Sequence, residues 1–157
     1  MAPPNGTRLA ETRLIFYEEL LEAARRAASR AYAPYSGFRV GSALLCAGDA
    51  AVFTGCNVEN ASYGLTLCAE RVAAATAVAA GRHDFAAIAI YAEGPEVPVP
   101  CGACRQFLAE FNDGLVVVVS NGKSGESFLL SELLPRSFGR QSLPAQATPQ
   151  ADPQGGR

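Results

Sequence analysis

The chain has 157 residues, of which 49% are hydrophobic, a size and composition typical of one globular domain. Thirteen Lys and Arg residues against fifteen Asp and Glu residues give a formal net charge of -2, with no block of basic residues. This balance disfavours binding to a nucleic acid polymer, whose phosphates attract clustered Lys and Arg, and favours a small-molecule substrate.

Residues 1–8 and 140–157 are rich in Pro, Gly, Gln and small polar side chains, which predicts disordered tails around a single domain of residues 9–139. The first predicted element is a helix over residues 11–31, because apolar residues recur there at helical spacing. These residues are Leu14, Tyr17, Leu20, Leu21, Ala24 and Ala28. Pro34 breaks the pattern.

Two strands are expected next, over residues 38–46 and 51–58, joined by a turn at residues 48–49. An Ala-rich helix over residues 68–80 follows, and Gly81 is its stop signal. The order so far, a helix followed by two strands and a second helix, is typical of an α/β fold.

A strand is expected over residues 85–92, and Pro100 stands where a helix reaching about residue 112 begins. Residues 115–119 form the most apolar run and predict a strand that is buried on both faces, before a short turn at residues 131–134. The whole order predicts an α/β fold, a three-layer α/β/α sandwich with a mixed central sheet.

No apolar stretch approaches the roughly eighteen residues that span a membrane, so no membrane association is expected. The first ten residues lack the apolar core of a signal peptide. Five cysteines fit a reducing compartment better than a disulfide framework, which favours a cytoplasmic protein. Cys46 and Cys56 are expected to be ordinary buried thiols.

Two short motifs contain the residues that could bind a metal or catalyse a reaction. They are Cys68-Ala69-Glu70 and Pro100-Cys101-Gly102-Ala103-Cys104. Three protein ligands and an open position are typical of catalytic zinc, whereas structural zinc takes four protein ligands. Zinc deaminases of nucleobases use this pattern, with a glutamate that carries protons and does not bind the metal. We therefore expect one zinc ion per chain on Cys68, Cys101 and Cys104, with Glu70 as the catalytic residue.

Three thiolates leave the zinc site with a net negative charge, which opposes ionisation of a zinc-bound water. Cys68 opens one predicted helix, and Cys101 and Cys104 lie at the start of another; the N-termini of helices stabilise thiolates. Arg71, one helical turn after Cys68, is expected to stabilise the negatively charged thiolates further by hydrogen bonding to them. By pattern alone it could also be a solvated surface arginine. Arg105 is a weaker second candidate.

The competing interpretation is a closed structural zinc site, which needs a fourth ligand. The only histidine, His83, follows a helix stop in a polar turn and is expected at the surface. Glu70 alone near a helix start would normally compensate the helix dipole. Beside three thiols, a catalytic role is favoured.

Over about residues 14–139 the chain resembles the small homotetrameric cytidine deaminases with a three-cysteine zinc site. The matching blocks are Tyr35-Ser36-Gly37-Phe38-Arg39-Val40-Gly41, Gly55-Cys56-Asn57-Val58-Glu59-Asn60-Ala61-Ser62-Tyr63, Cys68-Ala69-Glu70-Arg71, Pro100-Cys101-Gly102-Ala103-Cys104-Arg105-Gln106, and Leu133-Leu134-Pro135 through Phe138. Several blocks in one order are more specific than the metal motif alone.

The resemblance implies that Asn57 and Glu59 hold the sugar of a nucleoside. Their i and i+2 spacing agrees, since such residues face the same side of an extended segment. An amide and a carboxylate together can donate to and accept from sugar hydroxyls. The resemblance further implies that Phe38 packs on the pyrimidine, although by pattern alone it is equally a core residue, and that the Ala69 backbone bonds the base.

The resemblance also implies a homotetramer in which Tyr63 and Phe138 reach, or lie beside, a neighbouring subunit's site. By pattern alone, Tyr63 could instead pack in the core and Phe138 could anchor the tail.

The implied reaction is hydrolytic deamination of cytidine and 2′-deoxycytidine to uridine and 2′-deoxyuridine with release of ammonia, a step of pyrimidine salvage. Zinc lowers the pKa of its water, and Glu70 passes protons to ring N3 and to the departing amine. Two alternatives stay open: deamination of another cytosine-containing nucleoside or antibiotic, which need not keep Asn57 and Glu59, and a non-catalytic zinc-binding module, which needs no Glu70.

Overall fold

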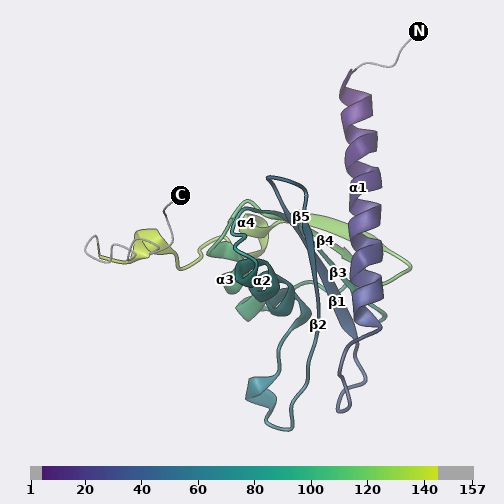
Figure 1. The fold of residues 1–157 in the computed structure, drawn as a ribbon, viewed down its shortest axis with the longest axis vertical. Coiled ribbons are helices and arrows are strands. Elements are labelled where there is room, and N and C mark those ends of the chain that lie inside the picture. Colours follow the sequence, from purple (N-terminus) through teal and green to yellow (C-terminus); the bar gives the residue numbers. More distant parts are fainter. Residues whose placement is uncertain (1–4, 145–157) are drawn as a thin grey trace.

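A computed structural model of the chain describes the backbone of residues 5–144 and the side chains of residues 17–144. The strands are β1 (Val40–Cys46), β2 (Val52–Cys56), β3 (Phe85–Ala92), β4 (Val116–Ser120) and β5 (Gly125–Leu129). They form one sheet in the order β2-β1-β3-β4-β5 (Figure 1). Only β3 and β4 pair in parallel, so the sheet is mixed, as predicted.

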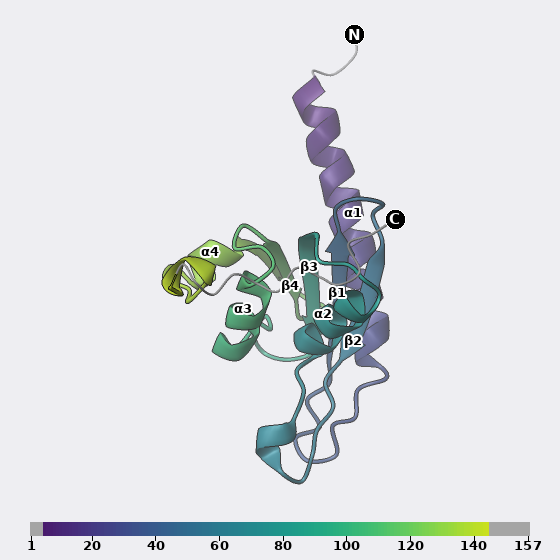
Figure 2. The same cartoon turned by 60° about the vertical axis from the view of Figure 1, so that its left-hand side comes forward.

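Helices cover both faces of this sheet. The helices are α1 (Asn5–Ala28), α2 (Ala69–Ala79), α3 (Gly102–Ala109) and α4 (Leu130–Leu133), with single 3₁₀ turns at η1 (Tyr63–Leu65) and η2 (Arg140–Ser142). The helix α1 lies on one face, and α2 and α3 lie on the other (Figures 1 and 2). One apolar cluster fills each of the two layers between helices and sheet. The predicted three-layer sandwich is confirmed.

Two glycines in the sheet allow the helices to approach it closely. A Cβ on Gly41 would lie 2.0 Å from the carbonyl oxygen of Ala24 in α1. On the other face, a Cβ on Gly55 would lie 2.4 Å from the carbonyl oxygen of Ala69 in α2. Because no side chain intervenes, the first turn of α2 rests directly on β2. This contact fixes the start of α2, where Cys68 and Glu70 lie.

The observed elements differ from the expected ones mainly at their ends. Helix α1 begins at Asn5, so residues 5–8 of the segment expected to be a tail are helical, whereas residues 1–4 and 145–157 lie outside the described part. Helix α3 stops at Ala109 because the Asn112 side chain bonds the backbone of Phe85 and Gly114 and closes a turn there.

Strand β5 was not predicted. Its sequence, Gly-Glu-Ser-Phe-Leu, lacks an apolar run, and most of its residues are exposed. It pairs only with β4 at the edge of the sheet, where polar residues are tolerated. Among residues 5–144, no helix is long and apolar enough to cross a bilayer.

Candidate metal centre and substrate pocket

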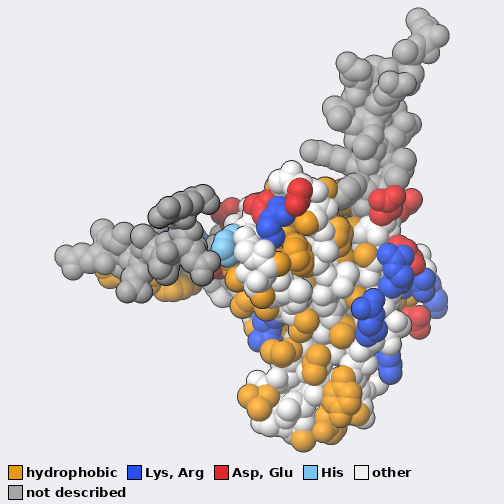
Figure 3. Space-filling view, viewed as in Figure 1, with side chains coloured by type: hydrophobic (Ala, Val, Ile, Leu, Met, Phe, Trp, Pro, Cys, Tyr) orange, Lys and Arg blue, Asp and Glu red, His pale blue; other side chains and the backbone are white. Residues whose placement is uncertain are grey.

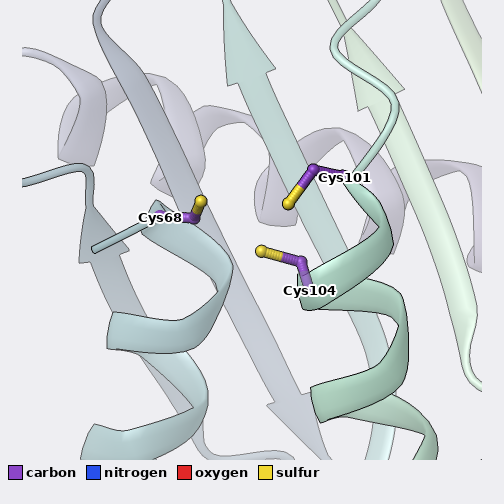
Figure 4. Close-up of side chains that lie close together, drawn as sticks. All are labelled: Cys68, Cys101 and Cys104. Atoms are coloured by element: carbon purple, nitrogen blue, oxygen red, sulfur yellow. The ribbon is translucent and has the colours of Figure 1, made fainter. Parts of the chain in front are cut away.

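Three cysteines from two helix starts meet at one point. Cys68 immediately precedes α2, Cys101 immediately precedes α3, and Cys104 lies in the first turn of α3. Their sulfur atoms all lie within 4.8 Å of one another, and Figure 4 shows them pointing toward a common centre. Zinc–thiolate bonds of about 2.3 Å require closely grouped sulfurs of this kind. The donor set therefore fits a zinc ion.

The group is open on one side. Cys104 is buried, Cys68 is half-buried and Cys101 is exposed. Within residues 17–144, no histidine, aspartate, glutamate or further cysteine joins the three thiols. His83 is exposed and stacks on Phe111, with 6.3 Å between ring centroids. The described residues thus offer no fourth ligand for a closed structural site.

Arg71 places a positive charge beside the Cys68 sulfur. Arg71 directs its Nη2 to the Cys68 Sγ at 3.8 Å and to the Thr66 carbonyl at 3.0 Å. A hydrogen bond from the Cys104 thiol, and after it the Arg71 guanidinium, lower the pKa of Cys68 to about 5 against burial. The same pairing with Cys68, and then burial, raise the pKa of Cys104. The free cluster therefore holds one thiolate readily, and a further positive charge is needed to ionise the rest.

Glu70 lies in the first turn of α2, between Cys68 and Arg71 in sequence, and only 5% of its surface is exposed. Burial raises its pKa above the ordinary value. A carboxyl group with a raised pKa holds and returns a proton near neutral pH more easily than an exposed one. Glu70 is thus a buried, protonatable group in the turn that follows a candidate metal ligand.

Asn57 and Glu59 anchor the segment that carries Phe38. The Asn57 Oδ1 accepts from the Val40 amide at 2.9 Å, and its Nδ2 donates to the Phe38 carbonyl at 2.9 Å. The Glu59 Oε2 accepts from the amides of Tyr35 and Ser36, at 2.8 Å and 3.2 Å. Phe38 itself is 48% exposed, so it is not a core residue in the single chain.

A cavity of about 370 Å³ opens beside this segment. Its lining residues are Tyr35, Ser36, Glu59, Asn60, Tyr63 and Thr66. Glu59 and Tyr63 therefore face one space, whereas neither Glu70 nor the three cysteines line it. The ring of Tyr35 meets that of Tyr63 edge-on, with 6.0 Å between centroids.

Two predicted site residues, Tyr63 and Phe138, are largely exposed in this chain. Tyr63 is 76% exposed and Phe138 is 63% exposed. Phe138 belongs to the segment after α4 that extends away from the sheet (Figure 1), and its carbonyl accepts a hydrogen bond of 2.6 Å from Gln106 in α3. Neither residue packs in the core, the alternative considered for Tyr63.

The sequence comparison decides the family. A family model described as the cytidine and deoxycytidylate deaminase zinc-binding region matches residues 15–120, which include both cysteine motifs. The chain belongs to this deaminase family. The resemblance to cytidine deaminases is thereby confirmed at the level of the family.

Relatives in this deaminase family match most of the chain. A cytidine deaminase of Sporosarcina psychrophila is 42% identical over 128 residues, which cover 80% of this chain and 93% of the relative. A probable cytidine deaminase of Dictyostelium discoideum is 44% identical over 131 residues, covering 83% and 88%. The crystal structure of a cytidine deaminase from Burkholderia pseudomallei is 49% identical and covers 77% of this chain and 98% of its own, with a TM-score of 0.74.

Some contacts around the candidate site were not predicted from the sequence. Arg105, considered as a second partner for the thiolates, instead donates to the carbonyls of Pro100 and Leu133, at 2.7 Å and 2.9 Å. It thus ties the start of α3 to α4. Ser36 donates to the Glu59 carboxylate and Gln106 donates to the Phe138 carbonyl, and the sequence predicted no role for either residue. Spacing alone gives no signal for such contacts across the fold.

Proposed function

We propose that this protein is a zinc-dependent hydrolase that deaminates cytidine and 2′-deoxycytidine, releasing ammonia, and so serves pyrimidine salvage. The observation that carries the proposal is the open group of three facing thiols next to the buried Glu70. Relatives named cytidine deaminase, at 42% to 44% identity over most of this chain, support it.

Cys68, Cys101 and Cys104 would hold one zinc ion per chain, as their mutual distances within 4.8 Å allow. When bound, zinc lowers the pKa of a water molecule and so supplies a hydroxide nucleophile at neutral pH. The helix starts and Arg71 stabilise the thiolates, which limits the negative charge that opposes this ionisation.

Glu70 carries the protons. It takes one proton from the attacking water and delivers it to N3 of the cytosine ring. A second proton moves from the added hydroxyl to the C4 amine through the same carboxylate. The C4–N bond then breaks, and ammonia and the uracil nucleoside leave. A buried carboxyl group with a raised pKa suits both the uptake and the release.

The substrate contacts proposed for the nucleoside are Phe38 on the base, the Ala69 backbone on the base edge, and Asn57 with Glu59 on the sugar. Three hydrogen bonds from residues 35 and 36 already occupy the Glu59 carboxylate. An ionised carboxylate has about four acceptor positions, so one remains for a sugar hydroxyl. A single hydrogen bond to one sugar hydroxyl discriminates poorly between ribose and 2′-deoxyribose. This supports the proposal that cytidine and 2′-deoxycytidine are both substrates.

We also propose a homotetramer with sites completed by Tyr63 and Phe138 of neighbouring subunits. Hydrophobic side chains gather at the end of the molecule where η1 lies (Figure 3), including Tyr35, Tyr63 and Leu65, each at least 51% exposed. Such exposed patches mark interaction surfaces. A reducing compartment, the cytoplasm, is proposed because the ligand thiols must stay reduced to bind metal.

A substrate panel tests this function. Wild-type protein with measured zinc content is mixed with cytidine, 2′-deoxycytidine, cytosine and a cytosine-containing nucleoside antibiotic, while cytosine absorbance and ammonia are followed. We expect turnover of the two nucleosides at similar kcat/KM. Turnover of only the antibiotic would support the other nucleoside class, and no ammonia from a zinc-loaded protein would support a non-catalytic module.

A further inference from the structure

The Ser36 hydroxyl connects two proposed substrate contacts that are far apart in the sequence. It donates to the Oε1 of Glu59 and accepts from the backbone amide of Phe38 at 3.0 Å. One hydroxyl thus bonds the proposed sugar-binding carboxylate and the backbone of the proposed base-stacking residue. A hydroxyl has one donor hydrogen, and here Glu59 uses it.

The Ser36 hydroxyl bonds a different oxygen of the Glu59 carboxylate from the other two donors. The amides of Tyr35 and Ser36 both reach Oε2, at 2.8 Å and 3.2 Å, whereas the Ser36 hydroxyl is the donor to Oε1. Two donors on one oxygen hold that oxygen but leave the second free to swing about it. The bond to Oε1 fixes the plane of the carboxylate and therefore the direction of its remaining acceptor position.

A purely local turn does not account for this arrangement. A serine hydroxyl that accepts from the amide two residues later is a common turn motif, and it needs no distant partner. In this chain the hydroxyl also bonds a side chain 23 residues away in sequence, and Ser36 and Glu59 both line the same cavity. The Ser36 hydrogen bond is also the largest cause that holds the pKa of Glu59 below its ordinary value.

The Phe38 backbone is held from both sides. Its amide donates to Ser36, and its carbonyl accepts from the Asn57 Nδ2 at 2.9 Å. Gly37, between the two, adopts a φ of 69°, a left-handed conformation that glycine tolerates. Phe38 therefore keeps its bond to Asn57 when the Ser36 hydroxyl is removed, whereas the Oε1 of Glu59 loses the donor that fixes it.

We propose that Ser36 is a positioning residue whose hydroxyl orients the Glu59 carboxylate toward a sugar hydroxyl. This inference rests on the proposed sugar contact of Glu59. It predicts that the effect of Ser36 depends on the sugar of the substrate, which a general structural role would not.

The test compares cytidine with 2′,3′-dideoxycytidine, which lacks both ring hydroxyls. For Ser36→Ala we expect kcat/KM for cytidine to fall about tenfold, the size of one charge-assisted hydrogen bond, and to change less than about twofold for the dideoxynucleoside. Ser36→Thr keeps a hydroxyl and should restore most of the loss. Ser29→Ala is the matched control, since among residues 17–144 the exposed Ser29 hydroxyl bonds only the carbonyl of Arg26 in α1.

A double-mutant cycle adds a second readout. In a Glu59→Ala background, Ser36→Ala should cost less than about twofold with cytidine, because the carboxylate that it orients is gone. Equal losses with both substrates, or fully additive losses in the cycle, would overturn the inference while the deaminase function stands. A wild-type protein that releases no ammonia from cytidine would instead refute the function. A Glu59→Ala variant with full cytidine activity would refute the sugar contact and this inference with it.

Discussion

One guanidinium nitrogen of Arg71, Nη2, contacts both the Cys68 sulfur at 3.8 Å and the Thr66 carbonyl oxygen at 3.0 Å. The Thr66 bond fixes the guanidinium while its charge faces the thiolate. The Arg71 Nε is buried and has no hydrogen-bond partner among the described residues, so a donor remains available beside the thiol cluster. A buried, unpaired donor at this point suits a cluster that must accumulate negative charge when it binds metal.

Arg71→Gln should therefore lower kcat for cytidine by about 10- to 100-fold, because outer contacts of a metal site typically have effects of this size. Steady-state kinetics on zinc-loaded protein measure the loss. Arg26→Gln, on the exposed surface of α1, is the control and should keep wild-type kcat. Full activity of Arg71→Gln would show that this arginine has no role in catalysis.

The zinc content of cysteine variants separates ligands from ordinary thiols. Cys68→Ala, Cys101→Ala and Cys104→Ala should each lose the single zinc ion per chain, since two thiolates bind too weakly to replace three. Cys46→Ala and Cys56→Ala should retain it, because neither belongs to the thiol group. Elemental analysis after dialysis decides the question, and zinc retained by Cys104→Ala, or lost from Cys46→Ala, would refute the ligand set.

Much of this site could be predicted from sequence because its parts are local. The spacing of Cys101 and Cys104 within one turn, and the position of Cys68 and Glu70 around a helix start, predict a shared direction of side chains. The contacts of Ser36 with Glu59 and of Gln106 with Phe138 could not be predicted, because they join segments brought together only by the fold.

The elements of the fold likewise divide into those that local sequence predicts and those that depend on distant contacts. Strand β4 has a strongly apolar sequence and was predicted within one residue, whereas the polar edge strand β5 depends on its partner and gave no signal of its own. The early end of α3 depends on Asn112, whose side chain reaches the distant Phe85 carbonyl. Tertiary context decided each of these differences.

Subunit mixing tests the proposal of shared sites. Glu70→Gln chains and Phe138→Ala chains are denatured, combined and refolded, and activity is compared with that of the two parents refolded separately. Some mixed tetramers would join an intact Glu70 to a neighbour's intact Phe138, so activity should exceed the sum of the parents. A fully active monomer in light scattering would refute the shared site, as would mixed activity that never exceeds the sum although Phe138→Ala alone is impaired.

The stability of the protein should depend on pH through Arg82. This side chain bonds Asp84 at 2.9 Å and Asp49 at 2.5 Å, and so joins the β1–β2 turn to the start of β3. Its hydrogen bonds hold the pKa of Asp84 well below the ordinary value of 3.8. The stabilisation is therefore present above about pH 4 and is lost as the pH falls further, toward the lowered pKa of the folded state.

Arg82→Gln should accordingly lower the unfolding midpoint by a constant amount between about pH 5 and pH 7, with a difference from wild type that shrinks below about pH 4. Thermal unfolding at one fixed chain concentration measures it, because an oligomer's midpoint depends on concentration. Arg136→Gln, an exposed arginine without an ion pair among the described residues, is the matched control. A difference that grows on acidification would contradict the assigned ion pairs.

The most direct test of the central claim is the turnover of Glu70→Gln with its zinc content measured in the same sample. The substitution keeps the shape of the side chain and removes its ability to carry protons. We predict one zinc ion per chain and a fall in kcat of at least about 10²- to 10⁴-fold, since general acid–base catalysis has this size and Glu70 serves several steps. Glu126→Gln, the same change on the exposed strand β5, should keep wild-type kcat. A zinc-loaded Glu70→Gln protein that retained about a tenth of wild-type turnover would contradict the role of Glu70 as the proton carrier.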